Sequence, residues 1–108
     1  MYQIKTERVP GKEPNKFNAD RFFFYVRIYL EAEQGALDSV ELVKYTLDPT
    51  FIDRERTATE RDKKFEIKIW TYGYFDISAL LILRDGTTKT VFGFVRFPLA
   101  ENETMTDP

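Results

Sequence analysis

The chain has 108 residues, of which 43% are hydrophobic, 16% aromatic and 31% charged, a composition typical of one globular domain and not of a disordered segment. Its 16 Lys and Arg residues against 18 Asp and Glu residues leave a net charge of −2, which argues against electrostatic binding to nucleic acid or to an anionic membrane. Because the chain contains no Cys and no His, disulfides, thiolate zinc sites, Cys nucleophiles and Ser/His/Asp triads are excluded.

The N-terminal segment shows no targeting signal. Met1–Pro10 is mixed and charged, and no run in the chain approaches the roughly 18 apolar residues that a membrane helix needs. We therefore expect a cytoplasmic protein that forms one domain over residues 1–108 and uses no cofactor. Within it we expect a polar N-terminal segment over residues 1–20 and a frayed acidic tail over residues 99–108.

Five segments show the period-two alternation of β-strands. In chain order, the alternation predicts strands over residues 21–30, 40–47, 65–70, 74–83 and 89–97. Between the last two, Asp85-Gly86 predicts a tight hairpin turn, because such a turn requires a positive φ and Gly adopts it readily. The predicted core draws on all five strands and consists of Phe24, Val26, Ile28, Tyr45, Leu47, Ile67, Ile69, Ile77, Ala79, Leu81 and Phe94.

The remaining segments are polar and show no helical period. Residues 31–39 contain Gly35, and residues 52–64 carry charges of both signs, which predicts a solvated loop. Five strands at short spacing, without helices, in a chain of this length predict an all-β protein. The expected architecture is an immunoglobulin-like antiparallel β-sandwich, in which each sheet buries one face.

Two short motifs accompany these strands. They are VKYTLDPTF over residues 43–51 and WTYGYFDI over residues 70–77, and the hairpin turn Asp85-Gly86 follows them. In this order and at this approximate spacing, from about Phe22 to Phe97, the motifs resemble the YEATS domain, and more closely its prokaryotic branch. In that branch a Leu-His-Pro-Thr-Phe type loop precedes a Gly-Trp-Gly-x-Phe-x-Ile type turn. The resemblance implies an immunoglobulin-like sandwich, in agreement with the alternation.

The resemblance also implies a binding site. Eukaryotic members of the family read acylated lysine in histone tails with one aromatic residue from each of two loops. Carried over to this chain, Phe51 and Tyr72 would be the aromatic walls. The hydroxyl of Thr50 and the backbone N–H of Tyr72 would hydrogen-bond the acyl-amide, and Gly73 would let the turn pass close to the ligand. A further aromatic sometimes comes from the loop before the first strand, where Phe17 is the candidate.

The sequence departs from the family pattern at three positions. Asp48 stands where His is usual, Tyr72 replaces the more usual Trp of the prokaryotic turn, and Tyr74 adds a ring where a small or acidic residue is usual. The Asp48 change has two alternative consequences. Its carboxylate either enters the pocket, where it favours unmodified lysine or a different ligand, or caps the turn at Pro49-Thr50 through local hydrogen bonds.

These observations lead to an expected function and two alternatives. We expect a non-enzymatic binding module that recognises an acylated lysine or a similar planar group on a protein, with no nucleic acid or membrane partner. The second hypothesis is an interaction or signalling domain whose sandwich surface contacts a protein through the outward aromatics Phe23, Tyr25 and Tyr29. The two motifs would then be structural, a capped strand end and a tight corner. An enzyme is the weakest hypothesis, because the sequence offers no nucleophile–base pair, metal cluster or phosphate loop.

Overall fold

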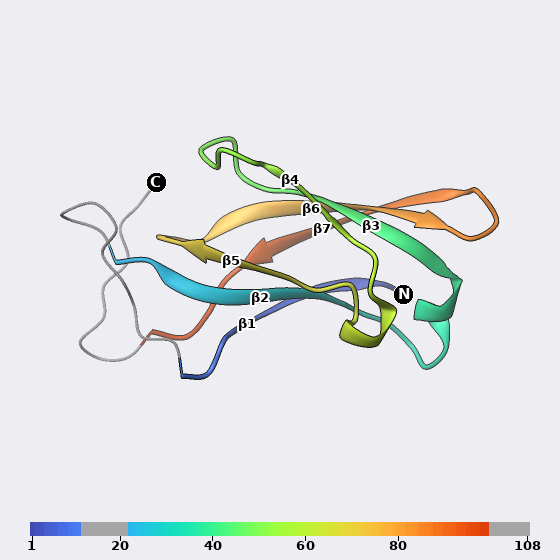
Figure 1. Cartoon of the computed structure of the whole chain (residues 1–108), viewed down its shortest axis with the longest axis horizontal. Coiled ribbons are helices and arrows are strands. Elements are labelled where there is room, and N and C mark those ends of the chain that lie inside the picture. Colours follow the sequence, from blue (N-terminus) through green and yellow to red (C-terminus); the bar gives the residue numbers. More distant parts are fainter. Residues whose placement is uncertain (12–21, 100–108) are drawn as a thin grey trace.

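The computed structural model describes residues 1–11 and 22–99, which form two antiparallel sheets that pack face to face (Figure 1). In chain order the elements of this part are β1 (Gln3–Arg8), β2 (Phe24–Glu31), the short 3-10 helix η1 (Ala36–Ser39), β3 (Val40–Thr46), β4 (Glu55–Ala58), a second 3-10 helix η2 (Arg61–Lys63), β5 (Ile67–Thr71), β6 (Phe75–Leu83) and β7 (Thr88–Val95). The predicted all-β, immunoglobulin-like sandwich is confirmed. No helix in the described ranges is long and apolar enough to cross a membrane.

The strand order brings two connections to one end of the sandwich. One sheet has the order β1-β2-β5 and the other has the order β4-β3-β6-β7. Strands β3 and β6 run antiparallel with Thr46 opposite Ser78, so the end of β3 lies beside the start of β6. The chain therefore leaves β3 and enters β6 at the same end of the sandwich, which is on the left in Figure 1.

The core lies between the two sheets and follows the alternation of the strands. On β2, Phe24, Val26 and Ile28 are fully buried, while the residues between them are half-buried. Tyr45 on β3 is also fully buried, and its hydroxyl donates a 2.7 Å hydrogen bond to the carbonyl of Phe65. Burial raises the pKa of the Tyr45 hydroxyl, which stays protonated and keeps its donor role.

Phe94 does not belong to the core, and this part of the prediction is wrong. The Phe94 side chain is 45% exposed, because Val91, Gly93 and Val95 form the inward face of β7. A Cβ on Gly93 would lie 3.0 Å from the Cβ of Ile4, so the β1 side chain occupies the space that a large residue would need. Among the other predicted core residues Ile67 is half-buried, and the rest are buried.

Two strands were missed in segments that the sequence predicted to be polar. Strand β1 lies within the polar N-terminal segment, and β4 lies within the charged segment that was predicted to be a solvated loop. Each has only a weak apolar pattern, since β4 buries Ala58 alone. Phe17 and residues 100–108, for which a third aromatic and a frayed tail were expected, lie outside the described residues.

The hairpin turn at Asp85-Gly86 is confirmed. Gly86 has a φ of +88°, and its N–H donates a 3.0 Å hydrogen bond to the carbonyl of Leu83. The N–H of Leu83 in turn donates to the carbonyl of Thr87 at 2.8 Å. This pattern matches a three-residue loop with Gly in the left-handed position.

Candidate functional site

The two motif loops face each other at one end of the sandwich. The first, residues 47–54, joins β3 to β4 within one sheet, and the second, residues 72–74, carries the chain from β5 in one sheet to β6 in the other. Both lie at the left end of Figure 1.

Asp48 caps the turn of the first loop. Its Oδ1 accepts hydrogen bonds from the Thr50 backbone N–H at 3.0 Å and from the Thr50 hydroxyl at 2.8 Å. The N–H of Phe51 donates to the carbonyl of Asp48 at 3.0 Å and closes the turn. The bonds from the N–H and the hydroxyl of Thr50 lower the pKa of the Asp48 carboxyl, so that Asp48 is ionised near neutral pH.

Thr71 braces the second loop and was missed from the sequence. It is 1% exposed, and its hydroxyl donates to the carbonyl of Gly73 at 2.9 Å and accepts the Gly73 N–H at 3.3 Å. These bonds fold the chain around Tyr72 and hold the residue that carries the ring. A signal was present, because Thr71 follows Ile67 and Ile69 at the inward positions of β5, and a buried hydroxyl needs partners.

A small cleft separates the loops. The described residues that line it are Asp48, Thr50, Phe51, Thr71, Tyr72, Gly73, Tyr74 and Phe75. The space between them is about 190 Å³ including the part open to solvent, but only about 10 Å³ of it can hold the centre of a water molecule. The smaller of these two volumes corresponds to room for about one water molecule. The cleft is therefore narrow in this structure.

The two aromatic walls rest on different neighbours. The ring of Phe51 packs on the buried ring of Phe75, with a centroid distance of 5.1 Å and an interplanar angle of 55°. The ring of Tyr72 meets Phe23 edge-on at 5.7 Å and 72°. The Tyr72 hydroxyl lies 3.5 Å from Thr50 Oγ1, a long contact that links the two loops across the cleft.

The structure brings all five predicted site residues to this one cleft. Asp48, Thr50 and Phe51 come from the first loop, and Tyr72 and Gly73 come from the second. Of the two alternatives for Asp48, the structure has the local cap, because the carboxylate accepts both hydrogen bonds from Thr50. The residue also lines the cleft.

Tyr74, the third departure from the family pattern, also lines the cleft. Its hydroxyl donates a hydrogen bond to the carbonyl of Phe97, and its ring meets that of Phe97 edge-on at 4.9 Å. Tyr74 therefore connects the second loop to the segment that directly follows β7.

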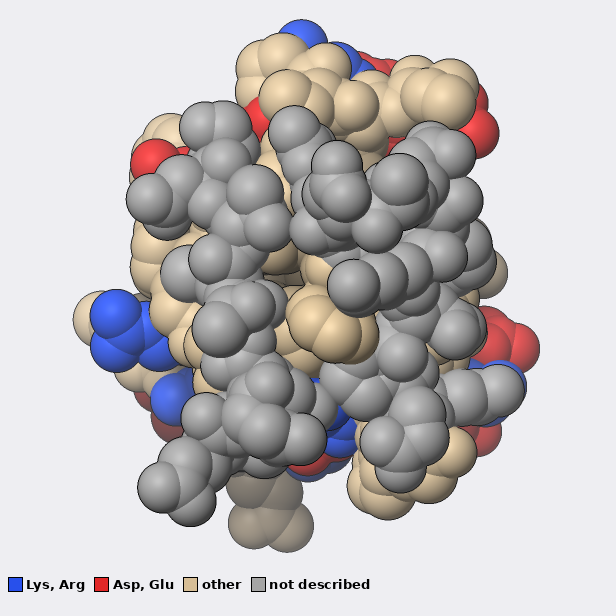
Figure 2. All heavy atoms as spheres, turned by 90° about the vertical axis from the view of Figure 1, so that its left-hand side faces the viewer, with Lys and Arg blue, Asp and Glu red and all other residues tan. Residues whose placement is uncertain are grey.

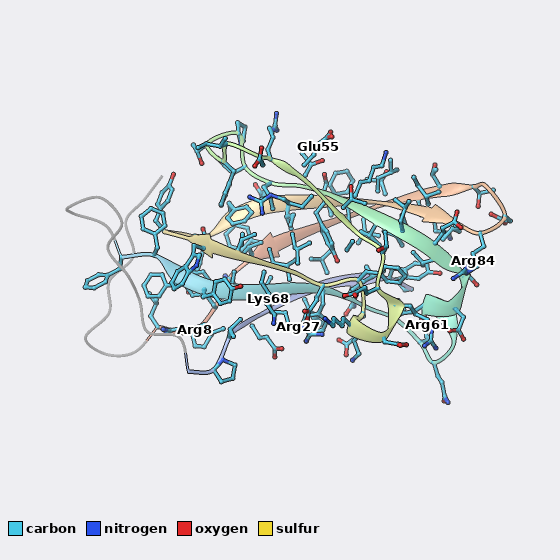
Figure 3. All side chains as sticks on the ribbon, in the orientation of Figure 1. Arg8, Arg27, Glu55, Arg61, Lys68 and Arg84 are labelled. Atoms are coloured by element: carbon cyan, nitrogen blue, oxygen red, sulfur yellow. The ribbon has the colours of Figure 1, made fainter. Side chains whose placement is uncertain are left out.

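The aromatic surface of the three-stranded sheet is less open than the sequence suggested. The three residues expected to be exposed there are all half-buried: Phe23, Tyr25 and Tyr29. The Tyr25 ring packs on Trp70 with a centroid distance of 4.8 Å, and the Arg27 guanidinium lies 4.0 Å from the centroid of Tyr29. Figure 3 shows Arg27 and Lys68 on this outer side of β2 and β5. Charged side chains interrupt the aromatic row.

The lining of the cleft is mainly aromatic and hydroxyl-bearing. Its described lining has four aromatic rings, two hydroxyls from Thr and a single carboxylate. Figure 2 looks onto this end of the molecule, and charged side chains of described residues are visible at both sides of the view. Within the described ranges there is no group of three or more His, Cys, Asp or Glu residues placed to hold a metal ion.

Comparisons with known proteins identify relatives of this fold. The family model for the prokaryotic YEATS domain matches residues 24–95, a range that contains both loops. No curated protein sequence matches the chain.

Among solved structures, the chain is similar to YEATS domains of the yeast protein Yaf9. The structure described as the crystal structure of the yeast AF-9 homolog Yaf9 superposes with a TM-score of 0.67 at 16% identity, over 91% of this chain and 66% of that one. The Yaf9 YEATS domain bound to H3K27ac gives 0.65 at 17% identity, over 97% and 76%. The Yaf9 YEATS domain recognising an H3K122suc peptide gives 0.65 at 16%, over 89% and 70%. At these identities the likeness shows the fold.

Proposed function

Because this chain belongs to the prokaryotic YEATS domain family, we propose that it is a non-enzymatic module that binds a protein through an acylated lysine. One observation carries the proposal: Phe51 and Tyr72, far apart in the sequence, line the same cleft together with the Thr50 hydroxyl. The Yaf9 YEATS domains, which share the fold, are bound to acylated histone peptides. A cytoplasmic location is part of the same proposal and rests on the sequence alone.

The chemistry of an acylated lysine suits this cleft. The modified side chain is uncharged and ends in a planar amide with one donor and one acceptor, followed by a short apolar group. Aromatic faces such as those of Phe51 and Tyr72 pack well against a flat group, and each such contact contributes about 0.5–1.5 kcal/mol beyond the area buried. Because the cleft is narrow, the two loops must separate by about 3.5 Å, the thickness of one planar layer, to admit the amide.

The Thr50 hydroxyl would act as an acceptor for the ligand. Its proton is donated to Asp48, and one lone pair of Oγ1 faces the Tyr72 hydroxyl in a long 3.5 Å contact, so the other lone pair remains to accept the amide N–H of the acylated lysine. The amide must find such partners when it leaves water, because an unsatisfied polar group costs about 1–3 kcal/mol. A single buried side chain offers little surface, so we expect dissociation constants of about a micromolar or weaker.

The test is a calorimetric titration with two synthetic peptides that differ only in acetylation of one lysine. The acetylated peptide should bind and the unmodified one should not. Tyr72→Ala should abolish binding, whereas the control Phe92→Ala, which truncates an exposed aromatic on β7, should leave the affinity unchanged. Equal binding of the two peptides, or tighter binding of the unmodified one, would contradict the proposal.

A second candidate function has its own observation. Phe92 is 79% exposed and Phe94 is 45% exposed, side by side on the outer face of β7, and Leu80 of β6 is 37% exposed on the same sheet. Exposed apolar groups of this kind mark contact surfaces. This face therefore replaces the aromatic row on β2 as the place where a partner would bind without acyl-lysine recognition. In the same titration, peptide binding that is lost in the Phe92→Ala variant and kept in the Tyr72→Ala variant would favour this function.

A further inference from the structure

Asp48 places a negative charge at the cleft. It is the only charged residue in the described lining, whose other members are aromatic, hydroxyl-bearing or Gly. The field of Arg54 also reaches the Asp48 carboxylate, but Arg54 is not among the lining residues. A ligand that enters between Phe51 and Tyr72 therefore meets one fixed negative charge.

The charge on Asp48 is firmly held. Two hydrogen bonds from Thr50 fix the carboxylate in the turn and lower its pKa, so that it does not become neutral to accommodate an anionic ligand near neutral pH. An ionised carboxylate has no proton to donate. A second carboxylate in the cleft would find repulsion and no matching donor from Asp48.

We propose that Asp48 is a specificity-determining residue, which makes the cleft bind lysine with an uncharged acyl group and exclude lysine whose acyl group ends in a carboxylate. The proposal rests on the proposed function and names the ligand class of that site. Acetyl- and butyryl-lysine belong to the accepted class, and succinyl- and glutaryl-lysine belong to the excluded class. The ligand of this chain would then differ in charge from the H3K122suc peptide that the Yaf9 YEATS domain recognises.

The size of the expected effect follows from Coulomb's law for a ligand carboxylate close to Asp48. Two unit charges about 6 Å apart repel by a factor of about 3 in affinity at the dielectric constant of water, and by about 100 at the effective value near a protein surface. The cleft is open on one side, so we expect a value between these limits. The acetylated peptide should bind about 10-fold more tightly than the succinylated one.

Calorimetric titration of the whole chain with three peptides tests the proposal. The peptides share one sequence and carry acetyl-lysine, succinyl-lysine or unmodified lysine at one position. The variant Asp48→Asn keeps an oxygen that can accept both bonds from Thr50 while it removes the charge. It should bind the succinylated peptide at least about 3-fold more tightly than the parent does, so that the ratio of the acetylated to the succinylated affinity falls.

The hairpin supplies a matched control variant. Asp85 Oδ1 accepts the backbone N–H of Thr87 at 2.9 Å and its hydroxyl at 2.6 Å, the same arrangement as at Asp48. It lies beside Arg84, at the end of the molecule opposite to the cleft (Figure 3). Asp85→Asn should therefore change neither affinity.

A salt titration of the parent protein avoids any doubt about folding of the variants. Screening weakens repulsion between charges that water reaches, so the ratio of the two affinities should fall as the salt concentration rises. A ratio near one at low salt, with clear binding of the acetylated peptide, would overturn this inference and leave the proposed function standing. Binding of neither acylated peptide would overturn both.

Discussion

The hydroxyl of Thr50 donates a 2.8 Å hydrogen bond to the carboxylate of Asp48, its neighbour two residues earlier in the turn. This hydrogen bond determines whether each group can act as a donor or as an acceptor towards a ligand. Thr50 Oγ1 can act only as an acceptor for a ligand, with one lone pair already facing the Tyr72 hydroxyl at 3.5 Å, and Asp48 keeps its negative charge. The pair thus connects the local chemistry of an Asp-Pro-Thr turn to the ligand that the cleft can hold.

Thr50→Val should weaken the binding of an acetylated peptide by about 3- to 10-fold, the worth of one net hydrogen bond. Valine has nearly the shape of threonine, so the walls of the cleft are kept. The matched control is Thr87→Val, which removes the equivalent cap at the hairpin and should leave the affinity unchanged. Calorimetry measures both, and an unchanged affinity for Thr50→Val would show that the hydroxyl does not contact the ligand.

The protein should lose stability in acid through its capped turns. Hydrogen bonds from Thr50 and from Thr87 lower the pKa values of Asp48 and Asp85 in the folded state. A group whose folded pKa is depressed stabilises the fold above its unfolded pKa of about 3.9, and this contribution is lost as the pH falls through the folded pKa.

Urea unfolding between pH 7 and pH 2 measures that loss. The midpoint should fall below about pH 4, and the double variant Asp48→Asn/Asp85→Asn should show a shallower fall, because Asn caps without titrating. A double variant whose midpoint falls as steeply as that of the parent would refute the assignment.

Leu81→Ala should destabilise the fold by about 2–5 kcal/mol, since it opens a cavity in a fully buried part of β6. Its neighbour Leu80 points to the other face of the sheet and is 37% exposed. Leu80→Ala should therefore cost less than about 1 kcal/mol. Denaturant unfolding of the two variants compares one chemical change on the two faces of one strand, and similar losses would contradict the placement of the core.

Gly86→Val should cost about 1–2 kcal/mol, because it forces a β-branched residue to a φ of +88° at the hairpin turn. Thr88→Val, an exposed position at the start of β7, is the control and should be close to neutral. A Gly86→Val variant that melts at the temperature of the parent would show that the turn adopts another conformation.

The strands with strong alternation were predictable from the sequence. Segments such as that around Val26 alternate large apolar residues, and burial of one face follows directly. Strands β1 and β4 bury little of their own and form because β2 and β3 offer them hydrogen-bonding edges. The prediction for Phe94 was wrong because both faces of β7 carry apolar residues. Which face turns inward depends on the contact with Ile4, which lies about ninety positions away in the chain.

The candidate site was predictable in its membership and less so in its shape. The motifs identified Phe51 and Tyr72, and the strand order brings them to one cleft. The sequence could not show that each ring rests on a different neighbour, Phe75 or Phe23, because these contacts depend on how the loops pack. The hydrogen bonds between the Thr71 hydroxyl and the second loop could have been predicted, since Thr71 is a polar residue at an inward position just before the turn.

Binding of an acylated lysine between the two loops can be followed residue by residue in an NMR titration of the isotope-labelled protein. Addition of an acetyl-lysine peptide should shift the backbone amide signals of Thr50, Phe51, Tyr72 and Gly73, and should leave those of Phe92 and Phe94 in place. The matched unmodified peptide should shift none of them. Shifts confined to the outer face of β7, or identical shifts with the two peptides, would contradict binding of the acylated lysine in this cleft.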